Sequence, residues 1–472
     1  MAVRRFAVVP LLFLTMACAG ARPKPKPAPA LESAEPRAID EFVGKQFAAS
    51  GLVGLSLAVA KDGQIVLAKG YGVRSVKTGA PVDPDTLFAI GSITKQFTAA
   101  CIFLLAEEGK LSVDDPVGKY FPDLTRASDI TLLDLMNHVS GYPDYYPLDF
   151  VDRRTARPIA VDDLIRQYAT GPLDFEPGSR FSYSNTGFVI LGRVVEKVSG
   201  ESFGAFLERR ILKPLGLGHT RYDPDAADDA MAQGHTRFAL GPWKADALEA
   251  KGWLSGAGAM WSTASDLARW DLALGSGQVL KPESYRRMTA PRRLASGAYS
   301  NYGCGVSVQS KVDQVALAHD GEVNGFIAVN AAVPSARAAV VVLTNTEEVT
   351  QAKRIWSTVL NAVMPKPPIP KVAGPGAVEV AREIFKSYQA GAVDRARLGE
   401  EFSFWLTEER VKEAAAQLAP WGVPLEAKLV RNWERGGMEV SLVELSFERG
   451  VLEVEMYRKP DGRIEELFVT RQ

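Results

Sequence analysis

A serine and a lysine three residues apart form the first pair in the sequence whose side chains could perform covalent chemistry together. Ser92 and Lys95 stand where the apolar pattern predicts a helix over 94–108, closed by Gly109. Residues three apart on a helix share a face, so the lysine amine would reach the serine hydroxyl. A serine hydroxyl is a weak nucleophile until a base takes its proton. A lysine can be that base when its surroundings destabilise the protonated amine. The pair therefore predicts a nucleophilic serine at a helix N-terminus, whose free N–H groups suit a developing oxyanion.

Two later motifs could complete such a site. Tyr183 and Asn185 lie on a predicted loop in FSYSNTGF, where a tyrosine can relay a proton and an asparagine amide can hold the lysine and the substrate. His319 and Gly321 lie in the strand-like segment ALAHDGEVNGF. A glycine within a strand indicates that another group approaches its backbone, and a substrate lying along an edge strand would fit. Each motif alone has a simpler structural explanation, since a capping serine, a packed loop tyrosine and a satisfied histidine are all common.

The order of the three motifs, S-x-x-K, then Y-x-N, then H-x-G, resembles that of the penicillin-recognising serine hydrolases. This superfamily includes class C β-lactamases, DD-carboxypeptidases, D-amino-acid peptidases and related esterases. The resemblance covers residues 39–364, and the segments that carry it are FAIGSITKQFTAA, LLDLMNHVSGYP, EPGSRFSYSNTGFVILG, ILKPLGLGHT and MWSTASDLARW.

The resemblance implies a role for each motif residue. Ser92 would be the acylated nucleophile and Lys95 its base or proton relay. Tyr183 would be the second proton-transfer residue, and Asn185 would orient the lysine and the substrate amide. The backbone N–H groups of Ser92 and Glu322 would form the oxyanion hole.

The third motif departs from the K-T-G of the family. His319 takes the place of the lysine and would contact a substrate carboxylate, with Gly321 beside the substrate. Because a histidine is mostly neutral at pH 7, it offers a β-lactam carboxylate less charge than a lysine would. Glu322 stands where family members usually have a small residue, and its side chain would narrow the groove or repel an anionic substrate. His138, in another family segment, is assigned a structural role.

The departures favour a DD-carboxypeptidase, D-aminopeptidase or esterase. The alternatives are a β-lactamase proper and a non-catalytic binding or scaffold relative. A match to the α/β-hydrolase elbow G-x-S-x-G around Ser202 follows a predicted helix rather than a strand, so Gly200 and Ser202 are interpreted as helix caps. Lys77-Thr78-Gly79 spells K-T-G but precedes the nucleophile, and it is interpreted as a turn.

Composition limits the partners and cofactors. The chain has 472 residues, and its 55 Lys and Arg nearly cancel its 56 Asp and Glu without a basic stripe, which argues against nucleic acid. The 4 histidines and the cysteines form no ligand cluster, so neither metal nor other cofactor is predicted. A disulfide between Cys101 and Cys304 is possible, but the apolar neighbours of Cys101 favour a buried, inert thiol. The expected partner is a small-molecule or peptide substrate.

The N-terminus has the pattern of a bacterial signal peptide over residues 1–19. Arg4 and Arg5 precede an apolar run over 6–16 and small residues. Either Ala17-Cys18-Ala19 is a signal-peptidase site, or residues 14–18 are a lipobox that makes Cys18 a lipidated N-terminus, which is favoured. Residues 20–37 are a Pro-rich tether. The protein is expected to be secreted or periplasmic, with a lipid at Cys18 as its membrane contact.

The remaining chain predicts an α+β protein of two domains. Strands over 52–60 and 64–71 form a hairpin around an Asp-Gly turn, and strands over 315–318, 326–333 and 338–344 would join it in one antiparallel sheet. Helices over 131–138, 160–168, 187–198, 203–212, 263–274 and 347–364 would flank the sheet or form a helical subdomain, giving a β-lactamase/transpeptidase-like domain over 38–365. A linker over 366–376 leads to a small α+β domain over 377–472 that resembles NTF2-like domains and whose partner is unknown.

Overall fold

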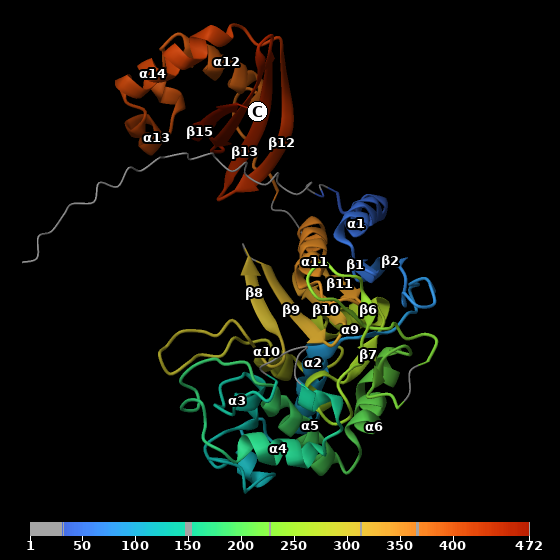
Figure 1. Cartoon of the computed structure of the whole chain (residues 1–472). Coiled ribbons are helices and arrows are strands. Elements are labelled where there is room, and N and C mark those ends of the chain that lie inside the picture. The colour runs from blue at the N-terminus through green and yellow to red at the C-terminus, as the bar shows by residue number, and fades with distance from the viewer. Residues whose placement is uncertain are drawn as a thin grey trace, which may run out of the picture. The chain divides into compact units, whose positions relative to one another are not determined.

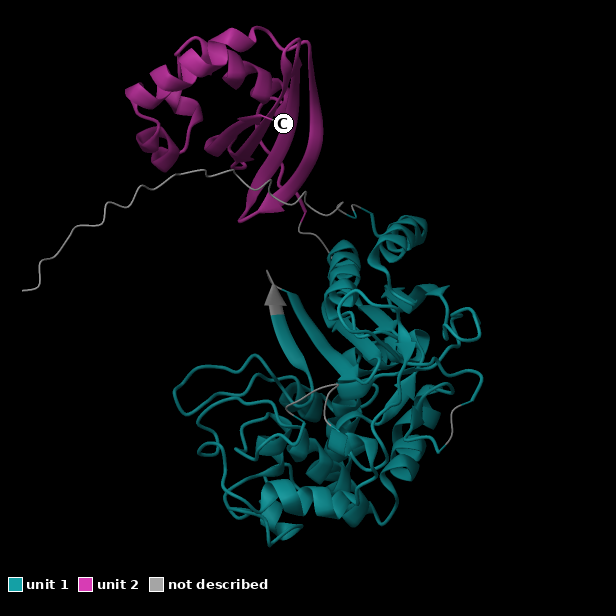
Figure 2. Cartoon of the chain, viewed as in Figure 1, with its two compact units in different colours: residues 1–364 teal, residues 365–472 magenta. Residues whose placement is uncertain are grey.

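The computed structural model of the chain describes residue 31 and residues 33–146, 153–225, 228–311, 314–364 and 368–471. It divides into two compact units, residues 1–364 and 365–472 (Figure 2). The division falls beside the linker expected at 366–376. The predicted signal peptide, Cys18 and most of the predicted tether lie outside the described residues.

A six-stranded antiparallel sheet forms the centre of the first unit, with the strand order β2-β1-β11-β10-β9-β8 (Figure 1). Its strands are β1 (Gly54–Lys61), β2 (Gln64–Gly72), β8 (Ser307–Lys311), β9 (Gln314–Val323), β10 (Phe326–Val333) and β11 (Ala338–Thr344). The predicted hairpin is confirmed, and Asp62 and Gly63 at its turn have φ of 54° and 84°, as a two-residue hairpin turn requires. Strand β11 pairs with β1 on one side and β10 on the other, so the two ends of the unit meet in one sheet.

Helices cover both faces of this sheet. Helices α1 (Pro36–Ser50) and α11 (Val349–Val363) pack on one face, where Ile39 and Ile355 share a core with Leu57 of β1. Helices α2 (Thr94–Glu107) and α9 (Ala264–Gly275) pack on the other face, where they share a hydrophobic core with Ala58 of β1. Helix α1 begins at Pro36, a position that proline favours, so the last two residues assigned to the tether are helical.

A helical subdomain lies between β2 and β8 in the sequence. Its helices are α3 (Leu132–Met136), α4 (Val161–Ala169), α5 (Asn185–Ser199), α6 (Phe203–Leu207), α7 (Lys213–Leu215), α8 (Ser255–Gly258) and α10 (Pro282–Met288). The short strands that accompany them are β3 (Phe88–Ala89), β4 (Arg221–Tyr222), β5 (His235–Thr236), β6 (Lys244–Ala245) and β7 (Met260–Ser262). Thr131 makes the predicted capping box with Asp134. Gly200 caps the C-terminus of α5 at φ 75°, and the Ser202 side chain caps α6, which confirms that the G-x-S-x-G match is coincidental.

The second unit has its own hydrophobic core. Helices α12 (Ala377–Gln389), α13 (Glu400–Trp405) and α14 (Glu408–Leu418) accompany an antiparallel sheet of β12 (Glu426–Arg435), β13 (Met438–Phe447), β14 (Gly450–Arg458) and β15 (Ile464–Arg471). Phe385 of α12 packs with Val443 and Val454 of the sheet. The α+β character is as expected, and the NTF2-like resemblance stays a prediction. Within the part of the chain that is described, no helix has the length and apolarity needed to span a membrane.

Candidate active site

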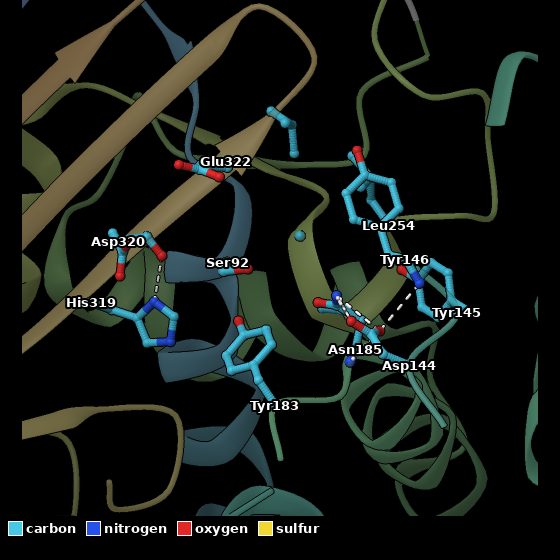
Figure 3. Close-up of a pocket in the computed structure, with 13 residues that line it drawn as sticks. Ser92, Asp144, Tyr145, Tyr146, Tyr183, Asn185, Leu254, His319, Asp320 and Glu322 are labelled. Carbon is cyan, nitrogen blue, oxygen red and sulfur yellow. Dashed lines mark hydrogen bonds between the residues drawn. The ribbon is translucent and has the colours of Figure 1, made fainter. Parts of the chain in front are cut away.

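Ser92 lies at the entrance to helix α2, in a short 3₁₀ turn over Gly91–Ile93. It faces a cavity of about 290 Å³, and the wall of that cavity also includes Tyr183, Asn185, His319 and Glu322 (Figure 3). Helix α2, the start of α5 and strand β9 thus bring together residues that are far apart in the sequence. The structure therefore assembles the predicted site residues around Ser92.

Lys95 is fully buried one helical turn after Ser92. Its Nζ lies 2.9 Å from Ser92 Oγ, 2.7 Å from Asn185 Oδ1 and 2.9 Å from the carbonyl oxygen of Ala257 in α8. The last two atoms can only accept hydrogen bonds, so two N–H bonds of Lys95 must point to them. A neutral lysine amine has two N–H bonds and one lone pair, and the lone pair can then accept a hydrogen bond from the Ser92 hydroxyl. In the ammonium form a third N–H takes that direction, so the proton can pass from Ser92 to Lys95 without rearrangement of the other two contacts.

Tyr183 and Asn185 flank this pair from the segment that leads into α5. The Lys95 Nζ lies 4.9 Å from the centre of the Tyr183 ring, and the Tyr183 hydroxyl points toward Ser92 (Figure 3). Ser184, between them, donates its backbone N–H to Nδ1 of the buried His138 over 3.1 Å. The His138 ring also packs 4.2 Å from the Tyr183 ring.

The structural role predicted for His138 fits these contacts, which hold the Tyr183 ring and the Ser184 backbone beside it. Burial, together with the charge of Lys95, keeps the pKa of His138 well below its usual value, so the ring is neutral.

Gly321 marks the closest approach between strand β9 and the nucleophile. A Cβ at this position would lie 2.0 Å from the carbonyl oxygen of Ile90 and 3.0 Å from the backbone nitrogen of Ser92. A Cβ at Gly91, which has φ 48°, would lie 2.8 Å from the backbone nitrogen of Glu322. Only glycine at both positions lets the two backbones meet, and this contact brings the backbone nitrogens expected to form the oxyanion hole near each other.

The edge of β9 beside the cavity is open. Strand β8 pairs with β9 only from Gln314 to Ala318 among the described residues, so the part from His319 to Val323 has no strand on that side. An extended substrate could therefore lie along it and use main-chain hydrogen bonds.

Known proteins share this arrangement of sequence and fold. A family model described as Beta-lactamase matches residues 37–363. The chain belongs to the Beta-lactamase family. Its members are serine hydrolases, and its relatives include penicillin-binding proteins and D-aminopeptidase.

Three relatives illustrate this membership. Penicillin-binding protein 4* of Bacillus subtilis is 29% identical over 315 residues, which are 63% of this chain and 69% of the relative. D-aminopeptidase of Gluconobacter oxydans is 27% identical over 300 residues, which are 62% of this chain but only 55% of the relative. The crystal structure of D-amino acid amidase from Ochrobactrum anthropi complexed with L-phenylalanine amide is 25% identical, has a TM-score of 0.58, and the match covers 69% of this chain and 97% of that one.

The third-motif histidine of this family member has both ring nitrogens engaged. Nδ1 lies 2.5 Å from the carbonyl oxygen of Asp320, so it must carry the proton, and Nε2 then accepts from the Tyr302 hydroxyl over 2.7 Å. Burial, with a further contribution from the charge of Lys95, lowers the pKa of His319 to about 4. The ring thus has neither a positive charge nor an uncommitted nitrogen to offer a substrate carboxylate, and the predicted carboxylate contact is not supported by this arrangement.

The cavity wall is acidic. Asp144, Asp320 and Glu322 line it, and no lysine or arginine is among its described lining residues. Asp320 forms an ion pair of 2.6 Å with Lys353 of α11. Lys353 balances the charge of Asp320, so Asp144 is the carboxylate that adds to the acidity expected from Glu322 at this wall.

Several residues of the site were missed by the sequence analysis. Asp144 and the two tyrosines beside it, Tyr145 and Tyr146, follow directly after the family segment that ends in SGYP. Their position next to this segment was the only sequence feature that could have identified them. Ala257 acts through its carbonyl oxygen, which carries no sequence pattern.

Cys101 and Cys304 are free and buried, and burial raises the pKa of both thiols, as expected of inert cysteines. Among the described residues, no group of three His, Cys, Asp or Glu side chains could hold a metal ion.

Proposed function

We propose that this chain is a secreted hydrolase that forms an acyl-enzyme on Ser92 and cleaves peptides or amides of D-amino acids, or related esters. The observation that carries the proposal is the fully buried Lys95, whose Nζ lies 2.9 Å from Ser92 Oγ and is held by two further acceptors. A surface lysine near a capping serine would have no such anchoring. The names of relatives such as D-aminopeptidase and D-amino acid amidase support the substrate class.

The proposed reaction has two halves. Ser92 Oγ attacks the substrate carbonyl carbon while its proton passes to Lys95, and the oxyanion accepts hydrogen bonds from the backbone N–H groups of Ser92 and Glu322. The bond to the leaving group then breaks, and Tyr183 passes the proton from Lys95 to the departing nitrogen or oxygen. In the second half, a water molecule gives its proton to the same relay and attacks the ester. The acid is released and Ser92 recovers its proton.

The charges at the site favour a peptidase, amidase or esterase over a β-lactamase proper. A β-lactam and a C-terminal D-amino acid both carry a carboxylate. The neutral His319 offers it no counter-charge, Asp144 and Glu322 add acidic groups to the wall, and the charge of Lys353 is already paired with Asp320. A substrate with a free amino group meets the opposite field, so we favour the D-aminopeptidase, amidase or esterase type over the DD-carboxypeptidase.

Intact-mass spectrometry with a fluorophosphonate tests the acyl-enzyme. The wild type should gain the mass of one phosphonyl group, whereas Ser92→Ala should gain none and the matched variant Ser202→Ala should behave as the wild type. Hydrolysis of D-alanine amide, L-alanine amide and a D-alanine ester should then show a preference for the D form that also vanishes in Ser92→Ala. A folded wild type that is not labelled by the probe and hydrolyses none of the three substrates would support a non-catalytic binding protein instead.

Localisation is a separate proposal. We expect export through the N-terminal signal peptide and a lipid at Cys18. Labelling of growing cells with a fatty-acid analogue should mark the wild type but not Cys18→Ala, whereas equal labelling of both, or of neither, would reject the lipid anchor.

A further inference from the structure

Asp144 lies in the wall of the catalytic cavity, and its carboxylate binds Asn185 twice. Its Oδ1 accepts the backbone N–H of Asn185 over 3.0 Å. The side-chain Nδ2 of Asn185 donates to Oδ1 over 3.2 Å and lies 3.3 Å from Oδ2 (Figure 3). The sequence analysis assigned Asp144 no role.

These contacts decide which end of the Asn185 amide faces the catalytic lysine. A carboxylate can only accept hydrogen bonds, so the NH₂ end of the amide must face Asp144 and the oxygen must face Lys95. In the flipped orientation the amide oxygen would face the carboxylate, and the NH₂ group would face the Lys95 amine at the present 2.7 Å contact. Both contacts would be repulsive when Lys95 is charged, so Asp144 holds the amide in one orientation.

The orientation of the amide in turn determines where the lone pair of Lys95 points. Lys95 gives one N–H to Asn185 and one to the Ala257 carbonyl, and its lone pair can face Ser92 Oγ, which lies 2.9 Å away. If the amide flipped, its NH₂ group would compete for that lone pair. The base would then be directed away from the serine.

We propose that Asp144 is a positioning residue for proton transfer from Ser92, which acts on Lys95 by fixing the amide of Asn185. The inference rests on the proposed acylation of Ser92. Asp144 also accepts the backbone N–H of Tyr146 over 3.3 Å, so it has a second, purely structural contact in its own loop. The experiment must separate these two roles.

The first measurement is the first-order rate of phosphonylation by a saturating fluorophosphonate as a function of pH. Fluoride leaves without needing a proton, so the rate reports the transfer from Ser92 Oγ to Lys95. In Asp144→Asn the plateau should fall by roughly 10–100-fold, the range typical of residues that orient a catalytic group. The acid limb of the pH–rate profile should also move to lower pH. Removing the negative charge of Asp144 makes the protonated form of the nearby Lys95 less favourable. The exposed Asp163 of α4, which pairs with Arg166, supplies the matched control Asp163→Asn, for which neither quantity should change.

A double-mutant cycle decides whether Asp144 acts through Asn185. If it does, Asp144→Asn should cost little in a background of Asn185→Ala, although it costs roughly 10–100-fold in the wild type. Additive losses would overturn the inference, and so would an unchanged plateau in Asp144→Asn. Thermal unfolding checks each variant. If Asp144→Asn does not fold, the same cycle is run with Asp144→Ser.

The result also separates the two proposals. A wild type that is not phosphonylated refutes the proposed function and the positioning role together. A wild type that is phosphonylated, with additive losses in the cycle, refutes only the role of Asp144.

Discussion

Replacing Gly321 by alanine should disable the enzyme through a single methyl group. The added Cβ would lie 2.0 Å from the carbonyl oxygen of Ile90 and 3.0 Å from the backbone nitrogen of Ser92. Both neighbours are backbone atoms of the turn that carries the nucleophile, so no side chain can rotate away. Strand β9 and this turn must therefore separate.

The separation can be estimated from the contact distance. Real Cβ atoms do not approach other heavy atoms within 3.0 Å, so the 2.0 Å contact must lengthen by at least about 1 Å. A misplacement of about 1 Å in a catalytic site costs on the order of 100-fold in rate, and the loss of one oxyanion donor costs roughly 100- to 1,000-fold. We therefore expect Gly321→Ala to lower kcat by roughly 100- to 1,000-fold, with a loss of stability of about 1–3 kcal/mol from overpacking.

The assay compares D-alanine amide hydrolysis and thermal unfolding for Gly321→Ala and Gly44→Ala. Gly44 lies in helix α1, and a methyl group added to it would have no other atom within 4 Å. Its replacement should therefore leave kcat unchanged and stabilise the helix by about 0.5–1 kcal/mol. An active Gly321→Ala with kcat within about threefold of the wild type would refute the argument that this close approach forms the oxyanion hole.

Three further predictions concern the proton relay, the pH dependence of stability and the second unit. Tyr183→Phe should slow amide hydrolysis by roughly 100-fold or more but phosphonylation much less, because fluoride needs no proton, and stopped-flow rates for both reactions check this. The pKa of about 4 for buried His319 lies below the unfolded value of 6.5, so the unfolded chain binds more protons and the free energy of unfolding should fall by up to about 3 kcal/mol from pH 6.5 to 4. Denaturant titrations should show a shallower fall in His319→Gln. Arg458→Met should destabilise the second unit by about 3–5 kcal/mol, because it leaves the carboxylate of Glu439 buried without its partner, and should leave the rate of Ser92 phosphonylation unchanged.

Local patterns made much of the fold predictable. The Asp62-Gly63 turn fixed the first hairpin, and the Thr131 and Gly200 caps fixed helix ends. These features depend on residues within a few positions of one another, which is the range over which a sequence pattern carries physical information. The order of the three motifs identified residues that line one cavity, and the close backbone approach expected at Gly321 is confirmed.

Features that depend on tertiary contacts were missed. Strand β12 was not predicted because its residues are mostly exposed on both faces, so no alternation marks it. The carbonyl of Ala257 reaches Lys95 only because α8 packs beside α2 and α5. The charge state of His319 was expected from its type alone, whereas its burial, its two hydrogen bonds and the charge of Lys95 decide it.

The histidine of the third motif and the acidic wall belong to one electrostatic arrangement. The charge of Lys95 contributes to the low pKa of His319, so the two side chains are close enough for a second cation at this position to be unfavourable. A neutral ring leaves Lys95 as the cation nearest the nucleophile, while Asp144 and Glu322 give the cavity a negative field. Proton transfer from Ser92 depends on the contacts of Lys95, which the proposed role of Asp144 links to the wall through Asn185, whereas the charge of the bound substrate depends on the acidic groups of the wall. Asp144 would thus serve both the proposed proton transfer and the selection of substrate charge, and a chain with all three motifs of the family would still disfavour the carboxylate on which penicillin recognition depends.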